Sequence, residues 1–593
     1  MTRYLITSAL PYINGMKHLG NLIGSMLPAD VYSRFLRLEG EDVLFICATD
    51  EHGTPAEIAA MEEGLDVQAY CDKMHKKQAD VYAQFGLSFD HFGRSSSKQN
   101  HELTQHFYKK LDENGFIEER GIQQVYSPDD GRFLPDRYVI GTCPKCGYER
   151  ARGDQCESCT TLLDPSDLIK PHSAISGSSN LELRTTKHLF LRLDKLAPEI
   201  LEWVKSHEGD WPKLTSSIAM KWLNEGLQPR CITRDLNWGV PVPREGFEDK
   251  VFYVWFDAPI EYVGATKEWA DQKPEERDWR AWWGGLQARP AGGASGSNTG
   301  SGAAGDVRYV QFLAKDNLPF HTIVWPATCM GTREDWTMAS YIKGFNWLTY
   351  CGGKFSTSQK RGVFMDQALE IYPADYWRYF LITMAPEGDD SDFTWELFAA
   401  TVNKDLAGNL GNFVNRTLKL TAKEFGPVVP AGGAPGEAER KLAEDCSAAV
   451  EEYRAALRAM EFRKSALALK KLWSLGNLYI DARAPWSLLK TDREEAAMVL
   501  RTCINLARVF ALASSPLIPF TSEKIMDALK MTAEERAAGM PFAATASNQV
   551  APLDEITVLQ PGREFTVPDV LFKKVEQEDV ARLTAEFGGT DQQ

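Results

Sequence analysis

The sequence predicts an α/β protein in three parts: a domain built on a parallel sheet, a cysteine-containing domain inserted into it, and an all-helical domain after it. Three observations support this. Strand-like and helix-like segments alternate over about the first 50 residues, four clustered cysteines interrupt that pattern, and apolar residues recur at helical spacing from about residue 398 onward. A chain of 593 residues has room for several domains of ordinary size.

The N-terminal segment has the pattern of a βαβ unit. Residues 3–10 are short and largely apolar, residues 18–38 carry apolar side chains at helical spacing, and residues 42–50 form a second short apolar run. Such a unit has parallel strands, and ligands bind at the carboxyl ends of those strands. We therefore expect residues 11–20 and 50–53 to lie at a ligand-binding edge.

Two later apolar runs, residues 251–259 and 307–316, predict further strands of the same sheet. The segment between the two groups of strands, residues 118–228, holds the cysteine cluster and predicts an inserted domain. Residues 290–305 are rich in glycine, serine and alanine, which predicts a flexible surface loop. The helical pattern from about 398 to 530 predicts an all-α domain.

Composition excludes several classes of protein. With 44% hydrophobic and 25% charged residues, the chain is globular, and not disordered or fibrous. Eleven cysteines are too few for a disulfide scaffold. The sequence shows neither a signal peptide nor an uninterrupted apolar run of the ~18 residues that a membrane span needs. We therefore expect a soluble cytoplasmic protein with no membrane contact.

The net charge of −16 argues at first against a protein that binds nucleic acid, because the basic face of such a protein usually makes the net charge of the whole chain more positive. Positive charge is nevertheless concentrated in two windows. Residues 453–490 hold eight Lys and Arg against two Asp and Glu, a local charge of +6. Residues 336–365 hold four Lys and Arg and no acidic residue. The distribution predicts limited basic strips that can meet RNA or a polyphosphate.

The four clustered cysteines predict a structural zinc site. Cys143, Cys146, Cys156 and Cys159 form two CxxC pairs separated by nine residues, a spacing typical of tetrahedral zinc knuckles. A site closed by four thiolates leaves no position for substrate, so the metal would be structural. Four unpaired thiols and a redox site remain as alternatives, although redox sites normally use one CxxC pair.

Residues 11–21, between the first predicted strand and helix, contain His18, Gly20 and Asn21. Backbone N–H groups and the helix dipole favour an anion at such a helix start, and a glycine allows a ligand to approach closely. This pattern predicts a phosphate site, and the alternative is a histidine that only caps the helix or faces solvent.

A second loop, residues 352–362, is rich in Gly, Ser and Lys and contains Lys354. Cations on such a loop suit a polyphosphate that passes through a charged transition state. The alternative is an ordinary solvated basic loop.

Together, HLGN (residues 18–21) and KFSTS (residues 354–358) resemble the two signature motifs of class I aminoacyl-tRNA synthetases. Further motifs resemble the methionyl-tRNA synthetase family in particular, and the resemblance covers roughly residues 3–575. It is strongest to the HLGN/KFS-type branch with one zinc knuckle. The motifs are residues 9–12, 47–53, 133–137, 253–259 and 314–321.

The resemblance implies a Rossmann-like nucleotide-binding domain with a parallel sheet, an inserted zinc-knuckle domain and a C-terminal all-α anticodon-binding bundle. It implies these boundaries: a catalytic domain in two halves at 1–117 and 229–330 with a flexible loop at 288–305, a connective insertion at 118–228 with its knuckle at 143–159, a stem-contact region at 331–397, the anticodon-binding domain at 398–560, and a tail at 561–593 that packs back on the body.

The implied activity is that of an ATP-dependent methionine–tRNA ligase. L-Methionine would react with ATP to give methionyl-adenylate and pyrophosphate, and would then pass to the 3′-terminal adenosine of initiator and elongator tRNA(Met). One structural Zn²⁺, Mg²⁺ bound with ATP and a monomeric enzyme are implied as well. Two alternatives remain: a non-catalytic tRNA-binding relative, or another nucleotidylyltransferase that resembles class I synthetases.

The resemblance also assigns roles to residues. His18, Asn21 and Lys354 would be catalytic, and ATP would be bound by these three with Gly20, Ser356 and Ser358. Methionine would be bound by Leu10, Tyr12, Asp50, Trp255, Ala258, Pro259, Tyr262 and His321, where Asp50 takes the ammonium and aromatic rings contact the thioether. Asn412, Arg416 and Trp486 would contact the anticodon, and Cys143, Cys146, Cys156 and Cys159 the zinc.

Two further expectations concern charges beside the active site. Thr357 stands where the family usually has a second loop lysine, so Lys354, Lys360 or Arg361 would have to supply its charge. We also expect an ion pair between Arg234 and Asp316.

Overall fold

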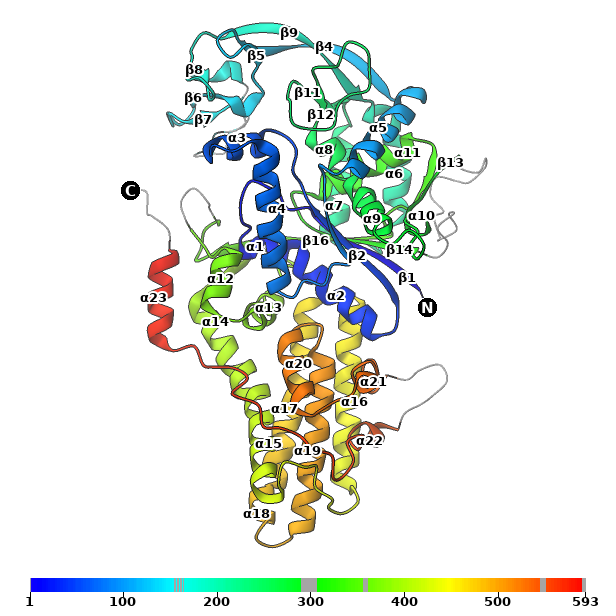
Figure 1. The fold of residues 1–593 in the computed structure, drawn as a ribbon, viewed down its shortest axis with the longest axis vertical. Coiled ribbons are helices and arrows are strands. Elements are labelled where there is room, and N and C mark those ends of the chain that lie inside the picture. The colour runs from blue at the N-terminus through cyan, green and yellow to red at the C-terminus, as the bar shows by residue number, and fades with distance from the viewer. Residues whose placement is uncertain are drawn as a thin grey trace.

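The computed structural model describes residues 2–153, 156, 159, 161, 163, 165–288, 307–355, 361–543 and 551–588. Figure 1 shows an elongated molecule with the mixed α/β part at one end and a bundle of long helices at the other. The expected loop at 290–305, most of the expected loop at 288–305, and residues 356–360 of the KFSTS segment lie outside the described residues.

A five-stranded parallel sheet forms the centre of the α/β part, in the order β16-β14-β1-β2-β3. The order reverses between β14 and β1, and in such sheets ligands bind outside the carboxyl ends of the strands at this switch point. The predicted α/β fold class and the N-terminal βαβ unit are confirmed. The strands are β1 (Arg3–Ser8), β2 (Asp42–Thr49), β3 (His91–Arg94), β14 (Val307–Ala314) and β16 (Tyr341–Phe345).

Alternate residues of the strands belong to two different hydrophobic cores. Leu5 and Leu44 face the core that contains α5 (Lys98–Glu113) and α9 (Glu261–Asp271). Ile6 and Phe45 face the core shared with α2 (Leu27–Leu38) and the helical domain. Both faces of the sheet are therefore buried, which explains why its strands are almost continuously apolar. The second core is continuous between the α/β part and the helical domain.

The inserted region extends from the sheet as a long antiparallel pair, β4 (Ile117–Ser127) and β9 (Glu182–Leu191). A small sheet at its end, β6 (Val139–Thr142), β7 (Ala151–Arg152) and β8 (Ile169–Ser173), carries the cysteines. The last part of the expected insertion forms α6 (Leu193–Ser206) and α7 (Lys213–Glu225), and these helices pack on the core of the α/β part through residues such as Trp203.

The predicted strand at residues 251–259 is wrong. Only β12 (Val251–Phe252) is extended, and it pairs antiparallel with β11 (Thr233–Arg234), outside the central sheet. Residues Val254–Asp257 form α8, one helical turn. Periodicity does not distinguish a short buried strand from a short buried helix, and the aromatic residues of this run favoured the strand interpretation.

Four long helices make up most of the helical domain, and they lie nearly side by side (Figure 1). They are α15 (Asn412–Phe425), α16 (Glu437–Arg458), α17 (Phe462–Arg483) and α19 (Arg493–Ser514). By length and composition alone α19 could cross a membrane, but 94% of its most apolar stretch is buried inside the bundle. It is therefore the core helix of this domain.

The C-terminal segment returns to the α/β part. After the bundle, the chain runs back along its side and forms α23 (Gln577–Phe587), which lies beside α14 (Trp395–Thr401) in Figure 1. The Phe587 ring lies 6.0 Å from the Trp395 ring, and the Phe587 carbonyl accepts a hydrogen bond from Gly362 N at 3.1 Å. The last helix thus touches the last residue of the basic loop.

The remaining elements connect these parts. They are α1 (Leu19–Asn21), η1 (Leu22–Met26), α3 (Thr54–Glu62), α4 (Val67–Gln84), β5 (Arg132–Phe133), η2 (Asp136–Tyr138), η3 (Pro165–Asp167), β10 (Arg230–Cys231), α10 (Arg280–Trp283), β13 (Gly284–Ala288), η4 (Phe320–Val324), α11 (Trp325–Gly331), β15 (Glu334–Trp336), β17 (Leu348–Tyr350), α12 (Met365–Ile371), α13 (Ala374–Thr383), β18 (Ser391–Phe393), η5 (Val402–Gly411), α18 (Pro485–Leu488), α20 (Pro519–Ala528), α21 (Ala533–Arg536) and α22 (Pro552–Glu555).

Candidate active site and anticodon-end cavity

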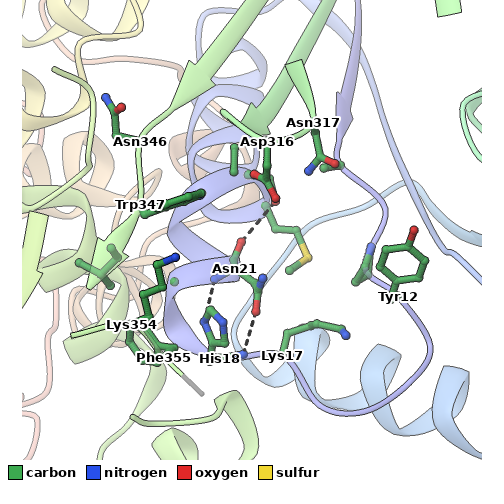
Figure 2. A pocket seen from close by; sticks show the side chains of 18 of the residues that line it. Tyr12, Lys17, His18, Asn21, Asp316, Asn317, Asn346, Trp347, Lys354 and Phe355 are labelled. Atoms are coloured by element: carbon green, nitrogen blue, oxygen red, sulfur yellow. Dashed lines mark hydrogen bonds between the residues drawn. The ribbon is translucent and has the colours of Figure 1, made fainter. Parts of the chain in front are cut away.

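A cavity of about 360 Å³ lies where β1 and β14 end. Its wall comes from three parts of the chain that are distant in sequence: the loop after β1 with the start of α1 and η1, the loop after β14, and the segment around β17. This is the switch point of the sheet, so the topology alone places a ligand site here. Figure 2 shows the labelled lining side chains: Tyr12, Lys17, His18, Asn21, Asp316, Asn317, Asn346, Trp347, Lys354 and Phe355.

His18 both caps the helix and lines the cavity, so the two interpretations of its position are compatible. Its Nδ1 accepts a hydrogen bond from Asn21 N at 3.3 Å, and Asn21 Oδ1 accepts one from His18 N at 3.2 Å. Burial, and secondarily the charge of Lys17, lowers the pKa of His18 to about 4. The imidazole is therefore neutral near pH 7, and because Nδ1 accepts, the proton sits on Nε2. His18 can thus donate a hydrogen bond without carrying a charge.

Gly20, which lines the cavity, also makes room for the ring of His18. A Cβ added to Gly20 would come within 3.0 Å of Cε1 and Nδ1 of His18, so the absent side chain makes room for the histidine ring. The same ring stacks on Phe355, with centroids 4.5 Å apart and planes inclined by 11°. Gly20 and Phe355 together hold the imidazole in one orientation at the edge of the cavity.

Lys354 reaches the cavity from the side opposite Asp316 and Asn317 in Figure 2. Its Nζ lies 5.0 Å from the centre of the Trp347 ring, a cation–π contact that keeps the ammonium at the cavity wall. Trp347 and Asn346 are site residues that sequence reasoning missed. Both follow the carboxyl end of β16, and the rule for parallel sheets could have drawn attention to them.

Three residues of the basic loop, Ser356, Thr357 and Ser358, lie outside the described residues, as does Lys360. Arg361, which was considered as a replacement cation, donates hydrogen bonds to the carbonyls of Tyr350 and Cys351 at 2.9 Å.

The residues expected to bind the amino acid gather beyond Leu10 and Tyr12, the two members of this set that also line the cavity. Trp255 Nε1 donates to Tyr12 Oη at 2.5 Å, and the Tyr262 hydroxyl lies 3.0 Å from His321 Nε2. Ala258 and Pro259 are buried directly after α8. The structure therefore brings aromatic rings from the loop after β1 and from α8, α9 and η4 together next to the cavity.

Asp50 directly follows β2 and pairs through its backbone with Tyr12. Its side chain is buried, and its Oδ1 makes no hydrogen bond to any residue that the structure describes. Burial raises the pKa of Asp50 well above its usual value, as do Asp257 and Glu51, and the charge of Lys17 opposes this. A buried carboxylate oxygen without a partner costs free energy that a cationic ligand would recover.

The expected ion pair between Arg234 and Asp316 is not formed among the described residues. The Arg234 guanidinium instead lies 3.8 Å from the centre of the Tyr253 ring and donates to the Thr233 carbonyl at 2.8 Å. The expectation was wrong because planar stacking on an aromatic face competes with ion pairing for arginine. Asp316 lines the cavity instead.

The four cysteines lie together at the end of the inserted region. Their Sγ atoms are all within 4.8 Å of one another, with 3.8 Å between Cys143 and Cys159 and 3.6 Å between Cys146 and Cys156. Tetrahedral bonds of ~2.3 Å to zinc place sulfur atoms ~3.8 Å apart, whereas a disulfide needs ~2.05 Å. A hydrogen bond with the Thr161 hydroxyl lowers the pKa of Cys159 to about 6, which favours the thiolate that zinc requires. The donor set thus fits the metal.

A second cavity, of about 420 Å³, lies at the far end of the helical domain between α15 and the region of α18. The Arg416 guanidinium is 5.1 Å from the centre of the Trp486 ring and donates to Asp481 Oδ1 at 2.7 Å. The left-handed backbone at Ala484 (φ 42°) turns the chain from α17 into α18 and leaves Trp486 40% exposed. Trp486 is therefore a surface residue and not a core residue.

Asn412, the third residue of the expected anticodon set, begins α15 one turn before Arg416, and its Nδ2 donates to Asn477 Oδ1 at 3.4 Å. The structure brings Arg416 and Trp486 into contact, whereas Asn412 is not among the residues that line their cavity. The cavity is lined by Asn415, Arg416, Lys419, Leu420, Lys423, Ile480 and Trp486.

Comparisons with known proteins give the same picture over the whole chain. Residues 4–418 match a family model described as tRNA synthetases class I (M), and residues 429–592 match one described as the anticodon binding domain of methionyl tRNA ligase. The methionine–tRNA ligase 1 of Acaryochloris marina is 60% identical over 587 residues, which cover 99% of this chain and 100% of that protein. The methionine–tRNA ligase of Streptomyces avermitilis is 59% identical, with the same coverage.

A solved structure has the same fold. The methionyl-tRNA synthetase of Mycobacterium tuberculosis in complex with methionyl-adenylate aligns with a TM-score of 0.73 at 24% identity, covering 96% of this chain and 100% of that one.

Proposed function

The chain belongs to the methionyl-tRNA synthetase family of class I aminoacyl-tRNA synthetases. We propose that its active-site cavity binds ATP and, next to it, methionine, and that the cavity beside Trp486 binds the tRNA anticodon. It is a methionine–tRNA ligase: it joins L-methionine to tRNA(Met) through a methionyl-adenylate, with release of pyrophosphate. The observation that carries this conclusion is full-length identity of 60% to a methionine–tRNA ligase.

In the first step, the methionine carboxylate attacks the α-phosphate of ATP, and pyrophosphate leaves. A carboxylate is already a nucleophile at pH 7, so the site needs no general base, and catalysis rests on positioning and on stabilising charge. We assign the α-phosphate side to His18, Asn21 and Gly20, and the departing phosphates to Lys354 with Ser356 and Ser358. The neutral Nε2–H of His18 supports this role, because it donates a hydrogen bond without needing an acidic medium.

We assign the amino-acid side to the aromatic cluster and Asp50. The substrate ammonium would satisfy the buried Oδ1 of Asp50, and its positive charge would hold that carboxylate ionised. The thioether would meet Tyr12, Trp255, Tyr262 and His321, with sulfur–aromatic contacts of ~0.3–1.5 kcal/mol each. Leu10, Ala258 and Pro259 would complete the apolar wall.

In the second step, methionine moves to the terminal adenosine of tRNA(Met), of both the initiator and the elongator type. We assign anticodon recognition to Asn412, Arg416 and Trp486, because an exposed indole next to a guanidinium offers stacking and hydrogen bonding to unstacked bases. The basic strip at residues 453–490 would meet the tRNA backbone, which predicts that binding weakens with salt.

Zinc and magnesium have different proposed roles. Zn²⁺ would be held by Cys143, Cys146, Cys156 and Cys159 and would stabilise the small sheet of the insertion. Mg²⁺ would arrive with ATP. Metal analysis should find about one zinc per chain, and Cys143→Ser should lose it while the control Cys351→Ser, an exposed cysteine outside the cluster, keeps it. Retention of zinc in Cys143→Ser would refute the ligand set.

We further propose that the enzyme works as a cytoplasmic monomer and that its domains follow the boundaries expected from the sequence. Size-exclusion chromatography with light scattering tests the oligomeric state, and a dimer would contradict it.

The function itself is tested by methionine-dependent exchange between ATP and pyrophosphate and by charging of tRNA(Met). Both activities are expected. A non-catalytic relative would bind tRNA without exchange, and a nucleotidylyltransferase would exchange without charging. Either result would overturn the assignment.

A further inference from the structure

Lys17 is a charged residue of the cavity to which the family signature motifs assign no role. Among the described residues that line the cavity, the fixed cations are Lys17 and Lys354, and the acid is Asp316. Figure 2 shows the two lysines on either side of His18. A substrate that carries a carboxylate and a triphosphate into this space would therefore meet one lysine at each end of the histidine.

The position of Lys17 is fixed at both its side chain and its backbone. Its Nζ donates to Asn14 Oδ1 at 3.2 Å, and its carbonyl accepts from Met365 N at 2.9 Å, at the start of α12. It directly precedes His18, so the capping pair of that residue also holds Lys17. The ammonium is thus presented to the cavity from a fixed stretch of backbone.

Lys17 is electrostatically coupled to both substrate-binding groups of the site. Its charge lowers the pKa of His18, and it opposes the rise in the pKa of Asp50. Asp50 is the proposed anchor of the methionine ammonium, and His18 is the proposed contact of the α-phosphate. In an α-amino acid the carboxylate is one carbon from the ammonium, so the reacting oxygen must lie between these two residues, in the field of Lys17.

We propose that Lys17 is a catalytic residue whose ammonium contacts the methionine carboxylate and the α-phosphate of ATP together. This rests on the proposed function, because Asp50 and His18 define where the two groups meet. The carboxylate oxygen forms a bond to phosphorus, the bond to the bridging oxygen breaks, and its electron pair leaves with pyrophosphate. No proton is transferred. Lys17 offsets the repulsion between two anions that must approach to bonding distance.

The alternative role for Lys17 is that of a counter-ion to Asp50, which the substrate ammonium replaces when methionine binds. That role predicts a change in methionine affinity and no change in turnover, so binding and catalysis separate the two.

The experiment compares Lys17→Met, which keeps length and removes charge, with Lys17→Arg, which keeps charge. Lys76→Met is the matched control, because Lys76 is exposed on α4 and pairs with Asp80. We expect Lys17→Met to lower kcat for ATP–pyrophosphate exchange ~100-fold or more, the loss typical of one transition-state contact. We expect its Kd for methionine, from tryptophan fluorescence, to change less than about threefold. Lys17→Arg should recover at least a tenth of kcat, and Lys76→Met should match the unmodified protein.

The pH profile adds a readout that packing alone would not move. Burial lowers the pKa of Lys17 to about 8 against the field of Asp50. The titratable groups beside it in the cavity wall are His18, which is neutral, and Tyr12, whose pKa burial raises well above its usual value. Asp366, next to Met365 on α12, is paired with Lys77. Since the charged form is active, kcat/KM for ATP should fall as pH rises through about 8, and in Lys17→Arg this fall should move to higher pH.

Each outcome supports or overturns the proposed role of Lys17. Unchanged kcat in Lys17→Met overturns the proposal. If methionine binding is lost as well at this unchanged kcat, Lys17 is only the counter-ion of Asp50. If Lys17→Met has a lowered melting temperature, full recovery of kcat and stability in Lys17→Arg still shows that the positive charge is required. The shift of the pH profile to higher pH in Lys17→Arg then confirms that this charge acts in catalysis. Absence of exchange in the unmodified protein would overturn the proposed function and this role together.

Discussion

The active-site cavity and the cavity beside Trp486 are built in different ways. The active-site cavity is formed by three chain segments that are distant in sequence and meet at the carboxyl ends of parallel strands. Its rim is open to solvent at Trp347, whereas the neighbouring Asp50 is only 4% exposed. The other cavity is formed by one face of α15, the end of α17 and α18, and its aromatic residue, Trp486, is 40% exposed. A deeply buried acid therefore lies beside the first cavity, whereas no acid is among the described residues that line the second.

This difference corresponds to what each site has to do. Removing charged groups from water makes their interactions with a reacting phosphate stronger, at the cost of free energy of unfolding. An exposed ring can stack on a base without that cost and release it again. Chemistry and recognition are separated here by distance, and the proposed ammonium anchor Asp50 is buried whereas the proposed base contact Trp486 is exposed, so variants in the two cavities should affect different steps.

The largest effect is expected from Asp50→Ala. Loss of the ammonium contact should lower the kcat/KM for methionine in ATP–pyrophosphate exchange by ~10²–10³-fold, with tRNA binding unchanged. Asp50→Asn should be equally inactive and more stable to heat at pH 7. The reason is that burial raises the pKa of Asp50, so the folded state is stabilised as pH falls through that pKa and is penalised above it. Exchange at the unmodified rate in Asp50→Ala would remove this residue from the site.

The next largest effect is expected from Trp486→Ala. Stacking on one base is worth ~1–3 kcal/mol, so kcat/KM for tRNA charging should fall ~10–100-fold. ATP–pyrophosphate exchange should not change, because the ring lies at the far end of the bundle (Figure 1, near α18). Trp269→Ala is the matched comparison, because Trp269 lies in the α/β part and its ring contacts Arg277. Equal loss of exchange and charging in Trp486→Ala would contradict the separation of the two cavities.

A smaller effect on the chemical step is expected from Gly20→Ala. The new Cβ would lie 3.0 Å from the His18 ring and would push it from its stack on Phe355, which should lower the kcat of exchange about tenfold. Gly388→Ala is the control, since a Cβ there meets nothing within 4 Å. If Gly20→Ala keeps full activity, the orientation of His18 is not set by this contact.

The sequence predicted the fold class well because the signals are local. Alternation of apolar residues with turn signals places β1, α2, β2 and β14, and two CxxC pairs place the cysteine cluster. Residues 251–259 failed because a short apolar run is compatible with either a strand or a buried helical turn. Tertiary packing, and not the residues of the run, decides between them.

The candidate site was predicted to different extents. Motifs indicated His18, Lys354, Asp50 and Trp486, each by its place in a recognisable pattern. Trp347 and Lys17 were missed, since nothing in the local pattern distinguishes a lysine or tryptophan in a cavity from one on the surface. Such residues become visible only when the strand order brings their loops to the same edge. The ion pair of Arg234 failed for the same reason, because stacking on Tyr253 is a tertiary contact.

The smallest effect is expected at the contact that joins the two regions. Phe587 at the end of α23 is largely buried beside Trp395, and its carbonyl accepts a hydrogen bond from N of Gly362, the last residue of the basic loop. Phe587→Ala leaves that backbone bond possible but loosens the helix that presents it, so the kcat of exchange should fall about threefold with an unchanged KM for methionine. Glu586→Ala, an exposed neighbour that pairs with Arg582, should have no effect. A helix that positions the basic loop slows adenylate formation, and therefore slows exchange, when it is loosened. If Phe587→Ala instead lowers tRNA charging and leaves exchange unchanged, the C-terminal helix acts with the cavity of the helical domain and not with the loop.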